Sequence, residues 1–449
     1  MPVCPLVQTF LARWLVALDV VTLLIGLGLG IAGTPRGYLL ALLVPIAIGP
    51  FTYARWRLHR SLAPALGDRG ATVLAVIGIT CDVVLFAQLL TARAPETLPF
   101  LHGDGIGWIG PVWFSTHALW LGGHGIAAAV RGLRRLGQRG WALIARTSSP
   151  PDAPESPERR EFLQYMGAAA AVVPFAAAAS GVPLSYDFRV EERELIIPGW
   201  PRALDGLRVV HLSDIHVGGG MTRERLLRVA ELTNACQPDF VAHTGDFLIH
   251  ASGDFDAPLY EALSRVRAPL GQWACLGNHD YDDADRFVRR LGDAGVTTLR
   301  DRLTRLEIDG QPLELGGLEF VFRPTPRAAS HQRIIEGWGE RTNAPRLLLN
   351  HDPSTFGALP ADAASLVLSG HTHGGHVGMQ LGKSHAITVI GLVGLPDQGV
   401  FARGDMRLFV TRCVGFYGYP MRVGIPPEIS LLILRTPGSP TAGEPVRSL

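Results

Sequence analysis

The chain has 449 residues, room for about three domain-sized units, and a formal net charge of only +1. A charge so close to zero argues against a protein that binds nucleic acid through bulk electrostatic attraction. Five cysteines are scattered along the chain without a CxxC pair, so they indicate neither a disulfide framework nor a thiolate metal site. With 47% hydrophobic and 18% charged residues, the composition is more apolar than that of an ordinary soluble protein.

Most of this apolar excess lies in the first 182 residues. Five windows are each close to the ~20 residues that cross a bilayer as a helix, and short basic or Gly/Pro-containing loops separate them. The pattern predicts a four-helix transmembrane region over 1–146 and a fifth transmembrane helix over 162–182, with the lipid bilayer as partner, rather than the buried helices of a soluble domain. The windows are 15–31, 37–53, 71–90, 108–130 and 162–182.

The loop arginines predict the orientation of these helices. Arginines are concentrated between the second and third windows and between the fourth and fifth, and they are sparse in the other two loops. By the positive-inside rule, we expect the N-terminus in the cytoplasm and everything after Val182 outside it.

A Pro/Ser-rich linker over 147–161 precedes the fifth window and ends in Arg159-Arg160-Glu161. Paired arginines followed by Phe-Leu and an Ala-rich apolar segment resemble a twin-arginine export signal placed inside the chain. The alternative is that these are ordinary juxtamembrane arginines. Both interpretations predict the same topology.

Beyond residue 182, short apolar runs alternate with a helical pattern, which predicts an α/β domain over 183–436. Polar clusters end most of the apolar runs, and in α/β folds ligands gather beyond the carboxyl ends of the strands. We expect 406–410 and 429–434 to complete a second sheet, and the Pro/Gly/Ser-rich tail 437–449 to be disordered. The expected elements are an edge strand over 187–197, strands 207–212, 240–243, 272–276, 347–349 and 365–368, and a helix over 222–237.

Five polar clusters follow these apolar runs and contain side chains that bind metals. Carboxylate and amide oxygens mixed with imidazoles suit Mn²⁺, Fe or Zn²⁺ better than Ca²⁺ or Cu(I). Seven such ligands exceed what one tetrahedral zinc ion takes, so one carboxylate is expected to bridge two ions, an arrangement that serves in-line attack on phosphorus. The clusters are Asp214-Ile215-His216, Gly245-Asp246, Gly277-Asn278-His279-Asp280, Asn350-His351-Asp352 and His371-Thr372-His373.

These clusters resemble the signature of the calcineurin-like metallophosphoesterase superfamily, which runs DxH, GD, GNH[D/E], H and GHxH. The resemblance covers roughly 207–434, and every signature position is filled. Gly374-Gly375 and the segment 420–429 resemble the bacterial membrane-anchored branch. The resemblance implies a four-layered α/β/β/α sandwich, and it agrees with the two divalent metal ions (Mn, Fe or Zn) expected from the ligands. With the apolar windows and loop charges, it predicts a multi-pass protein of the bacterial cell membrane whose phosphoesterase domain lies on the extracytoplasmic side.

The resemblance also implies a role for each residue of the site. His279 corresponds to the family histidine that steadies the transition state or protonates the leaving group, and general-acid help of this kind is worth ~10²–10⁴-fold. The implied ligands are Asp214, His216 and His373 for the first metal, Asn278, His351 and His371 for the second, and Asp246 between the two.

Several neighbouring positions remain open. Asp280 either orients a neighbouring side chain or caps a turn, and we expect His211, His243 and His376 to be structural or to support the ligands. Position 376 often holds Gln in this branch, and the segment around Cys413 tends to hold Gly. Arg412 and Arg422 are either phosphate contacts or ordinary surface arginines.

The predicted function is hydrolysis of phosphoester bonds, with a diester preferred to a monoester on the resemblance alone. We expect a phosphoester substrate, either lipid-linked, a nucleotide sugar or an envelope polymer. The alternatives are a phosphomonoesterase and a membrane scaffold or sensor whose metal is structural, and the latter would be marked by a missing ligand or a replaced His279. A transport role for the membrane half lacks inverted repeats and broken-helix signals. The oligomeric state is not predicted.

Overall fold

The fold was obtained as a computed structural model. It describes residues 176–181 and 183–448 apart from 219, 250–255, 323, 340–341, 383–385, 418–420 and 442, together with positions 70, 73, 76–78, 80, 81, 84, 112, 116 and 132. Among these residues, none of the helices combines the length and apolar character that a membrane crossing requires. The predicted transmembrane region 1–146 and helix 162–182 are described only at those scattered positions and at 176–181, and the linker 147–161 with its twin-arginine-like motif lies outside the described residues.

The chain divides into two compact units, Met1–Ser180 and Gly181–Leu449. The first sheet of the second unit has six strands in the order β1-β14-β2-β3-β4-β5. β2 to β5 run parallel, and β14 is antiparallel to β2 and parallel to β1. The strands are β1 Arg189–Ile196, β14 Glu428–Arg435, β2 Leu207–Leu212, β3 Phe240–His243, β4 Gln272–Ala274 and β5 Val296–Thr298. The connecting segments include η4 Arg202–Leu204 and the helices α5 Arg223–Ala235, α6 Ala257–Ser264 and α7 Ala284–Asp293.

The second sheet has seven strands in the order β15-β12-β13-β9-β8-β7-β6. β7, β8, β9 and β13 run parallel. The strands are β6 Arg302–Ile308, β7 Gln311–Gly317, β8 Arg346–Leu349, β9 Leu366–Ser369, β12 Gly399–Arg403, β13 Met406–Val410 and β15 Val446–Ser448. Further elements are α8 Pro324–Gly337, η5 Pro353–Ala358, η6 His373–Gly375, the hairpin β10 Gly378–Gln380 and β11 Ala386–Thr388, and α9 Val389–Leu392.

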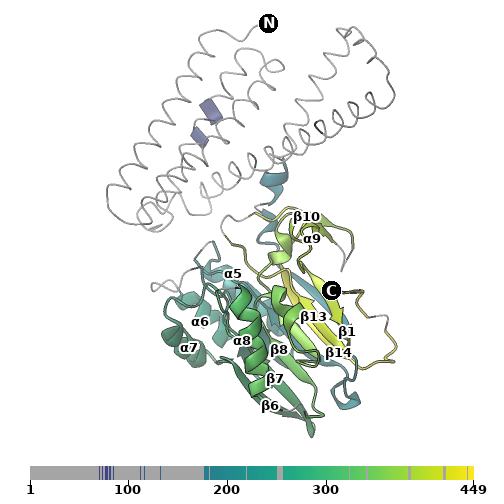
Figure 1. Ribbon diagram of the computed structural model, residues 1–449. Helices are drawn as coiled ribbons and strands as arrows, with labels where there is room; N and C mark the ends of the chain where they lie inside the picture. The colour runs from purple at the N-terminus through teal and green to yellow at the C-terminus, as the bar shows by residue number, and fades with distance from the viewer. Residues whose placement is uncertain are drawn as a thin grey trace, which may run out of the picture. The chain divides into compact units, whose positions relative to one another are not determined.

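Three apolar clusters show that these elements form four layers. The first cluster joins α5, α6 and α7 to one face of the six-stranded sheet. The second lies between the two sheets, and the third joins α8 and η5 to the outer face of the seven-stranded sheet. The domain is therefore the α/β/β/α sandwich expected from the sequence, with α5 to α7 on one flank and α8 along the other sheet (Figure 1).

Buried faces explain the sequence patterns of these layers. β2 is apolar on both faces, because Val209 packs between the sheets while Val210 packs under the helices. α5 begins after Thr222, whose hydroxyl accepts a hydrogen bond from the Arg225 amide. Its buried residues follow the spacing of one helical face. They are Leu226, Val229, Ala230 and Thr233.

Most of the predicted strands are confirmed, and two predictions are wrong. β14, predicted to complete the second sheet, lies between β1 and β2 in the first. The tail predicted to be disordered contains β15, which pairs in parallel with β12. Arg447 of β15 lies over the Phe401 ring, with its guanidinium carbon 4.1 Å from the ring centroid. The tail thus forms the edge of the seven-stranded sheet.

Candidate metal centre

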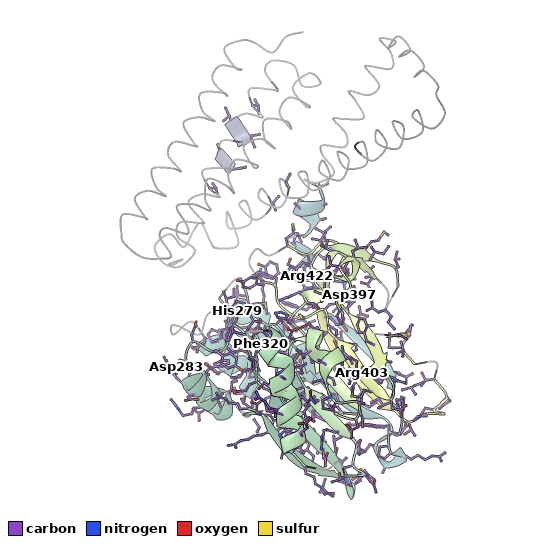
Figure 2. All side chains as sticks on the ribbon, viewed as in Figure 1. His279, Asp283, Phe320, Asp397, Arg403 and Arg422 are labelled. Atoms are coloured by element: carbon purple, nitrogen blue, oxygen red, sulfur yellow. The ribbon has the colours of Figure 1, made fainter. Side chains whose placement is uncertain are left out.

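The polar clusters predicted to bind metal all follow strands whose carboxyl ends meet between the two sheets. Asp214 and His216 follow β2, Asp246 follows β3, and Asn278 and His279 follow β4. From the other sheet, His351 follows β8, and His371 and His373 follow β9. In Figure 2, His279 of the first sheet and Phe320 of the second lie at the same end of the domain. Adjacent parallel strands thus bring distant residues to one site.

The backbone of these loops is unusual. Five of the predicted ligands adopt positive φ, a conformation that L residues other than glycine rarely take. Residues held in this conformation persist only where the surrounding structure fixes them, and such residues cluster at functional sites. The five are Asp214 (53°), His216 (51°), Asp246 (51°), His371 (66°) and His373 (52°).

Two motif glycines are required because carboxylates pack against their Cα atoms. A Cβ on Gly370 would lie 2.2 Å from Asp214 Oδ2, and a Cβ on Gly277 would lie 2.2 Å from Asp246 Oδ1. No side chain fits at such distances. Each glycine therefore lets a loop from a neighbouring strand approach a carboxylate directly.

One group of donor atoms surrounds Asp214. Its Oδ1 lies 3.3 Å from His373 Nε2 and 3.7 Å from His216 Nε2. The two imidazole nitrogens are 3.2 Å apart. One carboxylate oxygen and two imidazole nitrogens facing a common point form a donor set that suits Mn, Fe or Zn.

A second group surrounds His351. Its Nε2 lies 3.1 Å from Asn278 Oδ1 and 3.0 Å from His371 Nδ1. The same nitrogen lies 3.4 Å from Asp246 Oδ2, and this oxygen is 3.6 Å from His216 Nε2 of the first group. Asp246 Oδ2 therefore lies between the two groups, where the sequence predicted a bridging carboxylate.

Hydrogen bonds leave one oxygen of each carboxylate facing the donor groups. Asp214 Oδ2 accepts from the Ser213 hydroxyl, the His371 amide and the Cys413 thiol, while Asp214 Oδ1 is buried with no hydrogen-bond partner among the residues described here. Asp246 Oδ1 accepts from the His279 amide at 2.9 Å. A buried carboxylate oxygen without a donor is costly unless a cation faces it, so this pattern fits metal binding.

The ring nitrogens are oriented by backbone carbonyls. His351 Nδ1 lies 2.6 Å from the Thr244 carbonyl oxygen, and His279 Nδ1 lies 3.0 Å from that of Ile249. Because a carbonyl only accepts, each Nδ1 carries a proton. The Nε2 of His351 is thereby turned toward the donor atoms, and in His279 the nitrogen that faces away from the Ile249 carbonyl is Nε2.

Burial and charge set the protonation of these side chains. Burial lowers the pKa of His373 to about 4, so its imidazole is neutral at pH 7. Burial also opposes the charged form of His351, but the carboxylates of Asp246 and Asp214 outweigh it and raise its pKa to about 10. The two buried carboxylates thus draw a positive charge to this position, which a divalent cation supplies equally well.

Asp280 holds two of the loops together. Its carboxylate accepts hydrogen bonds from the backbone amides of Asp246, Phe247, Leu248 and Gly277. Burial, reinforced by the charge of Asp246, raises its pKa to about 7. Asp280 therefore caps its own turn, through the Gly277 amide, and also binds the backbone of the loop after β3.

Aromatic side chains that the sequence motifs did not predict line the rim of the site. The ring of Tyr417, which is 54% exposed, lies 4.7 Å from the His279 ring between centroids. On the other side, the Phe320 ring lies 5.8 Å from that of His351 and 5.3 Å from that of Phe322, which is 62% exposed. The signal in the sequence was the pair Phe320 and Phe322 shortly after the end of β7, but this strand was not predicted.

Neighbouring residues that the sequence left open have structural contacts. His211 Nε2 bonds to the Thr244 hydroxyl, and His243 Nε2 bonds to the Gln272 side chain. His376 Nδ1 lies 3.3 Å from the Met421 carbonyl oxygen. These contacts agree with the structural roles expected for the three histidines.

Neither arginine considered as a phosphate contact is a surface residue. Arg412 is buried and pairs with Glu428, its Nε lying 2.8 Å from Oε2. Arg422 is also buried and donates to the carbonyl oxygens of His373 and Arg412. Both are therefore committed to holding loops and sheets together, and both readings of them from the sequence are wrong.

Comparison with known proteins agrees with this geometry. Residues 207–375 match the family described as calcineurin-like phosphoesterase. A zebrafish (Danio rerio) "Transmembrane protein with metallophosphoesterase domain" is 28% identical over 68% of this chain and 68% of its own length. The "UDP-2,3-diacylglucosamine pyrophosphatase LpxG" of Chlamydia muridarum is 25% identical over 51% of this chain and 84% of its own length. The "Phosphodiesterase YaeI" of Escherichia coli is 26% identical over 51% and 82%.

The match spans the loops after β2, β3, β4, β8 and β9, which carry all seven predicted ligands and His279. Enzymes of this family use divalent metals, and the donor groups found here can hold them. The match of residues 207–375 to calcineurin-like phosphoesterases, together with relatives named as a phosphodiesterase and a pyrophosphatase, identifies this part of the chain as a phosphoric-ester hydrolase domain of the metallophosphoesterase type.

Proposed function

We propose that this chain is a membrane-anchored phosphodiesterase with two divalent ions in its metal centre. The observation that carries the proposal is the position of Asp246 Oδ2, 3.6 Å from His216 Nε2 and 3.4 Å from His351 Nε2. One carboxylate oxygen within reach of both donor groups is what a bridged pair of ions requires.

In this proposal Asp214, His216 and His373 hold the first ion, Asn278, His351 and His371 hold the second, and Asp246 bridges them. When bound, such a pair of ions (Mn, Fe or Zn) activates a water molecule and neutralises the charge of the phosphoryl oxygens. The chain itself positions the ions through the hydrogen bonds to Asp214 Oδ2 and Asp246 Oδ1.

His279 acts on the leaving group in this proposal. With Nδ1–H directed to the Ile249 carbonyl, Nε2 is the nitrogen that holds and delivers a proton to the departing oxygen. Its ring lies 5.3 Å from the His216 ring between centroids, so it borders the first donor group without belonging to it. This is the expected place for a group that meets substrate rather than metal.

The aromatic rim supports a diester or pyrophosphate with organic groups on both sides. Exposed Tyr417 lies beside the His279 ring, and exposed Phe322 packs on Phe320, which borders His351, so both rings can pack against such groups. A phosphomonoester has only one organic group to place. The relatives named as a phosphodiesterase and as a pyrophosphatase of a diacylated nucleotide sugar point to the same substrate class, including lipid-linked phosphoesters.

We further propose that the first half anchors the domain in the bacterial cell membrane by five helices, with the phosphoesterase domain outside the cytoplasm. The hydropathy of 1–182 supports this. The zebrafish relative with a transmembrane name matches more of the chain than the unit Gly181–Leu449 contains. Reporter fusions after Ser185 should be active outside the cytoplasm, and activity only inside it would refute the topology.

The central test compares Asp246→Asn with the exposed control Asp309→Asn in the full-length protein. We expect wild type and control to bind about two Mn²⁺ per chain and to cleave an activated aryl phosphodiester. Asp246→Asn should lose about a thousandfold or more of the rate and most of the metal. Equal rates for the two variants would refute the bridged centre, and a preference for the matching monoester would make the chain a monoesterase.

A further inference from the structure

The segment 377–396, called here the apolar hairpin, contains β10, β11 and α9 and presents an unusual surface. Of the large apolar side chains that are exposed in the described part of 183–448, most belong to this short segment. Leu392 and Val393 are 76% and 68% exposed, more than the other members. The members are Met379, Leu381, Ile387, Val389, Leu392, Val393 and Leu395.

A contiguous apolar surface of this kind on a folded domain marks an interaction site. β10 and β11 form a separate two-stranded sheet that pairs with neither large sheet. Their exposed apolar residues therefore do not belong to a face of either large sheet. The sequence of 377–396 contains no Asp, Glu or Arg and a single lysine, Lys383. A surface without acidic groups is suited to contact with lipid, whose headgroups are often anionic.

The apolar hairpin is fixed to the loop that carries two predicted ligands. The Thr372 hydroxyl, between His371 and His373, donates to the Asp397 carbonyl at 2.8 Å, and the Thr388 hydroxyl donates to the Asp397 carboxylate at 2.7 Å. A Cβ on Gly375 would lie 3.0 Å from Thr388 Cβ, so the ligand loop packs against β11. Whatever covers the hairpin is therefore held next to the metal centre.

The other side of the hairpin adjoins the place where the fifth apolar window ends. The Gly378 amide donates to the Val423 carbonyl at 2.9 Å, and the Arg422 amide donates to the Gly181 carbonyl at 3.0 Å. Gly181 also packs on Met421 and Val423. The chain thus enters this domain beside the hairpin, directly after the 162–182 window.

We propose that the apolar hairpin inserts into the surface of the membrane that the 162–182 window enters, and so holds the metal centre at the lipid headgroups. The proposal rests on the membrane anchor of the proposed function, and it adds an enzyme surface in contact with lipid and a substrate presented in the plane of the bilayer. Exposed Leu and Val side chains, the absence of acidic groups and the adjoining chain entry all favour lipid over a soluble partner.

The test compares two exposed valines, Val393 in the hairpin and Val446 in β15, which is 49% exposed. Each is changed to cysteine in a full-length chain whose Cys4 and Cys81 are replaced by serine, while Cys236, Cys275 and Cys413 are buried. A nitroxide is attached and the protein is placed in lipid nanodiscs. Collision of the label with oxygen, which concentrates in lipid, is then compared with collision with a water-soluble nickel chelate.

We expect the ratio of oxygen to nickel collisions to be several-fold higher for Val393→Cys than for Val446→Cys, and Leu392→Cys to repeat the result at the neighbouring position. Equal ratios at 393 and 446 would overturn the proposal. A label at position 393 that is shielded from the nickel chelate but couples magnetically to the label of another chain would also overturn it, because a second copy of the chain would then cover the hairpin.

Hydrolysis of a soluble aryl diester by the same nanodisc samples separates this inference from the proposed function. If the diester is cleaved and position 393 is open to the nickel chelate, only the inference about the hairpin fails. If position 393 lies in lipid and no diester is cleaved, the hairpin proposal stands and the proposed catalytic function fails.

Discussion

The two sheets of the sandwich contribute differently to the proposed metal centre. Loops of the six-stranded sheet provide both carboxylates, the amide of Asn278 and the imidazole of His216, whereas loops of the seven-stranded sheet provide only imidazoles. Each donor group nevertheless draws on both sheets, since His373 joins Asp214 and His351 joins Asn278. The centre is therefore a product of the packing between sheets, and neither sheet alone contains a complete set.

The largest effect is expected when one proposed ligand is removed from either sheet. We expect Asp214→Asn and His371→Gln each to lower the hydrolysis rate by about a thousandfold and to reduce the bound Mn²⁺ from about two ions to one. Metal analysis of the purified variants, with exposed Asp309→Asn as control, measures the loss. Complete loss of metal in both variants would show that the two donor groups do not bind separately.

The packing itself is tested by the ion pairs of Glu428, one of which joins the two sheets. Glu428 of β14 pairs with Arg193 of β1 at 2.9 Å and with Arg412, which follows β13 of the other sheet, at 2.8 Å. Glu428→Gln leaves two buried guanidinium groups short of a partner, so we expect it to lower the free energy of unfolding by about 3 kcal/mol. Chemical denaturation measures this, with the exposed Glu307→Gln as control, and equal midpoints would contradict it.

The same pair predicts how stability depends on pH. Burial raises the pKa of Glu428, but Arg193 and Arg412 outweigh burial and lower it to about 2. The stabilisation by Glu428 is therefore complete above about pH 4.5, its ordinary pKa, and is lost as the pH falls toward 2. The difference between wild type and Glu428→Gln should disappear over this acidic range.

His279 tests whether the six-stranded sheet also supplies chemistry. We expect His279→Gln to lower kcat about a hundredfold on a diester with a poor leaving group, because proton delivery to the departing oxygen is lost. Bound metal should be unchanged, since the side chain lies outside both donor groups. An activated leaving group needs less help, so the defect should shrink with it. Loss of metal in this variant would instead place His279 among the ligands.

The smallest effect is expected for Cys413, which contacts the proposed ligand Asp214 from the other sheet. The Cys413 thiol, in the loop after β13, donates to Asp214 Oδ2 at 3.1 Å. Cys413→Ala should weaken metal binding about tenfold, because Asp214 loses one of the donors that orient it. Cys413→Ser should retain most of the affinity, and Cys236→Ala, far from the site, should match wild type. Titration with Mn²⁺ distinguishes the three.

Short apolar runs in the sequence predicted where strands form, but they did not show to which of the two sheets each strand belongs. β2, β3 and β13 were predicted with the bounds found, because each is a short apolar run buried on both faces. β14 was assigned to the wrong sheet, because an apolar strand reads alike in either sheet and its neighbours β1 and β2 lie more than 200 residues earlier in the chain. The tail strand β15 was missed because polar and Gly/Pro-rich residues surround it.

The convergence of the seven proposed ligands was easier to predict than the packing around them. These ligands lie in short motifs placed directly after strands, so sequence order already implied that they meet. The burial of Arg412 and Arg422 could not be predicted, because the carboxylate of Glu191 and the carbonyl of His373, which bind them, come from distant segments. The exposed apolar hairpin was also missed, since an apolar run in a sequence does not show which residues the fold covers.

The four hydrogen bonds that Asp280 accepts have a consequence for handling the protein. They tie the loops after β3 and β4 to each other without calling on any ligand side chain. The polypeptide thus holds these two loops in place without metal, so removing the ions with a chelator should leave the fold intact. Manganese, iron and zinc can then be loaded in turn into one preparation, and the identity of the working ion becomes a question that reconstitution answers.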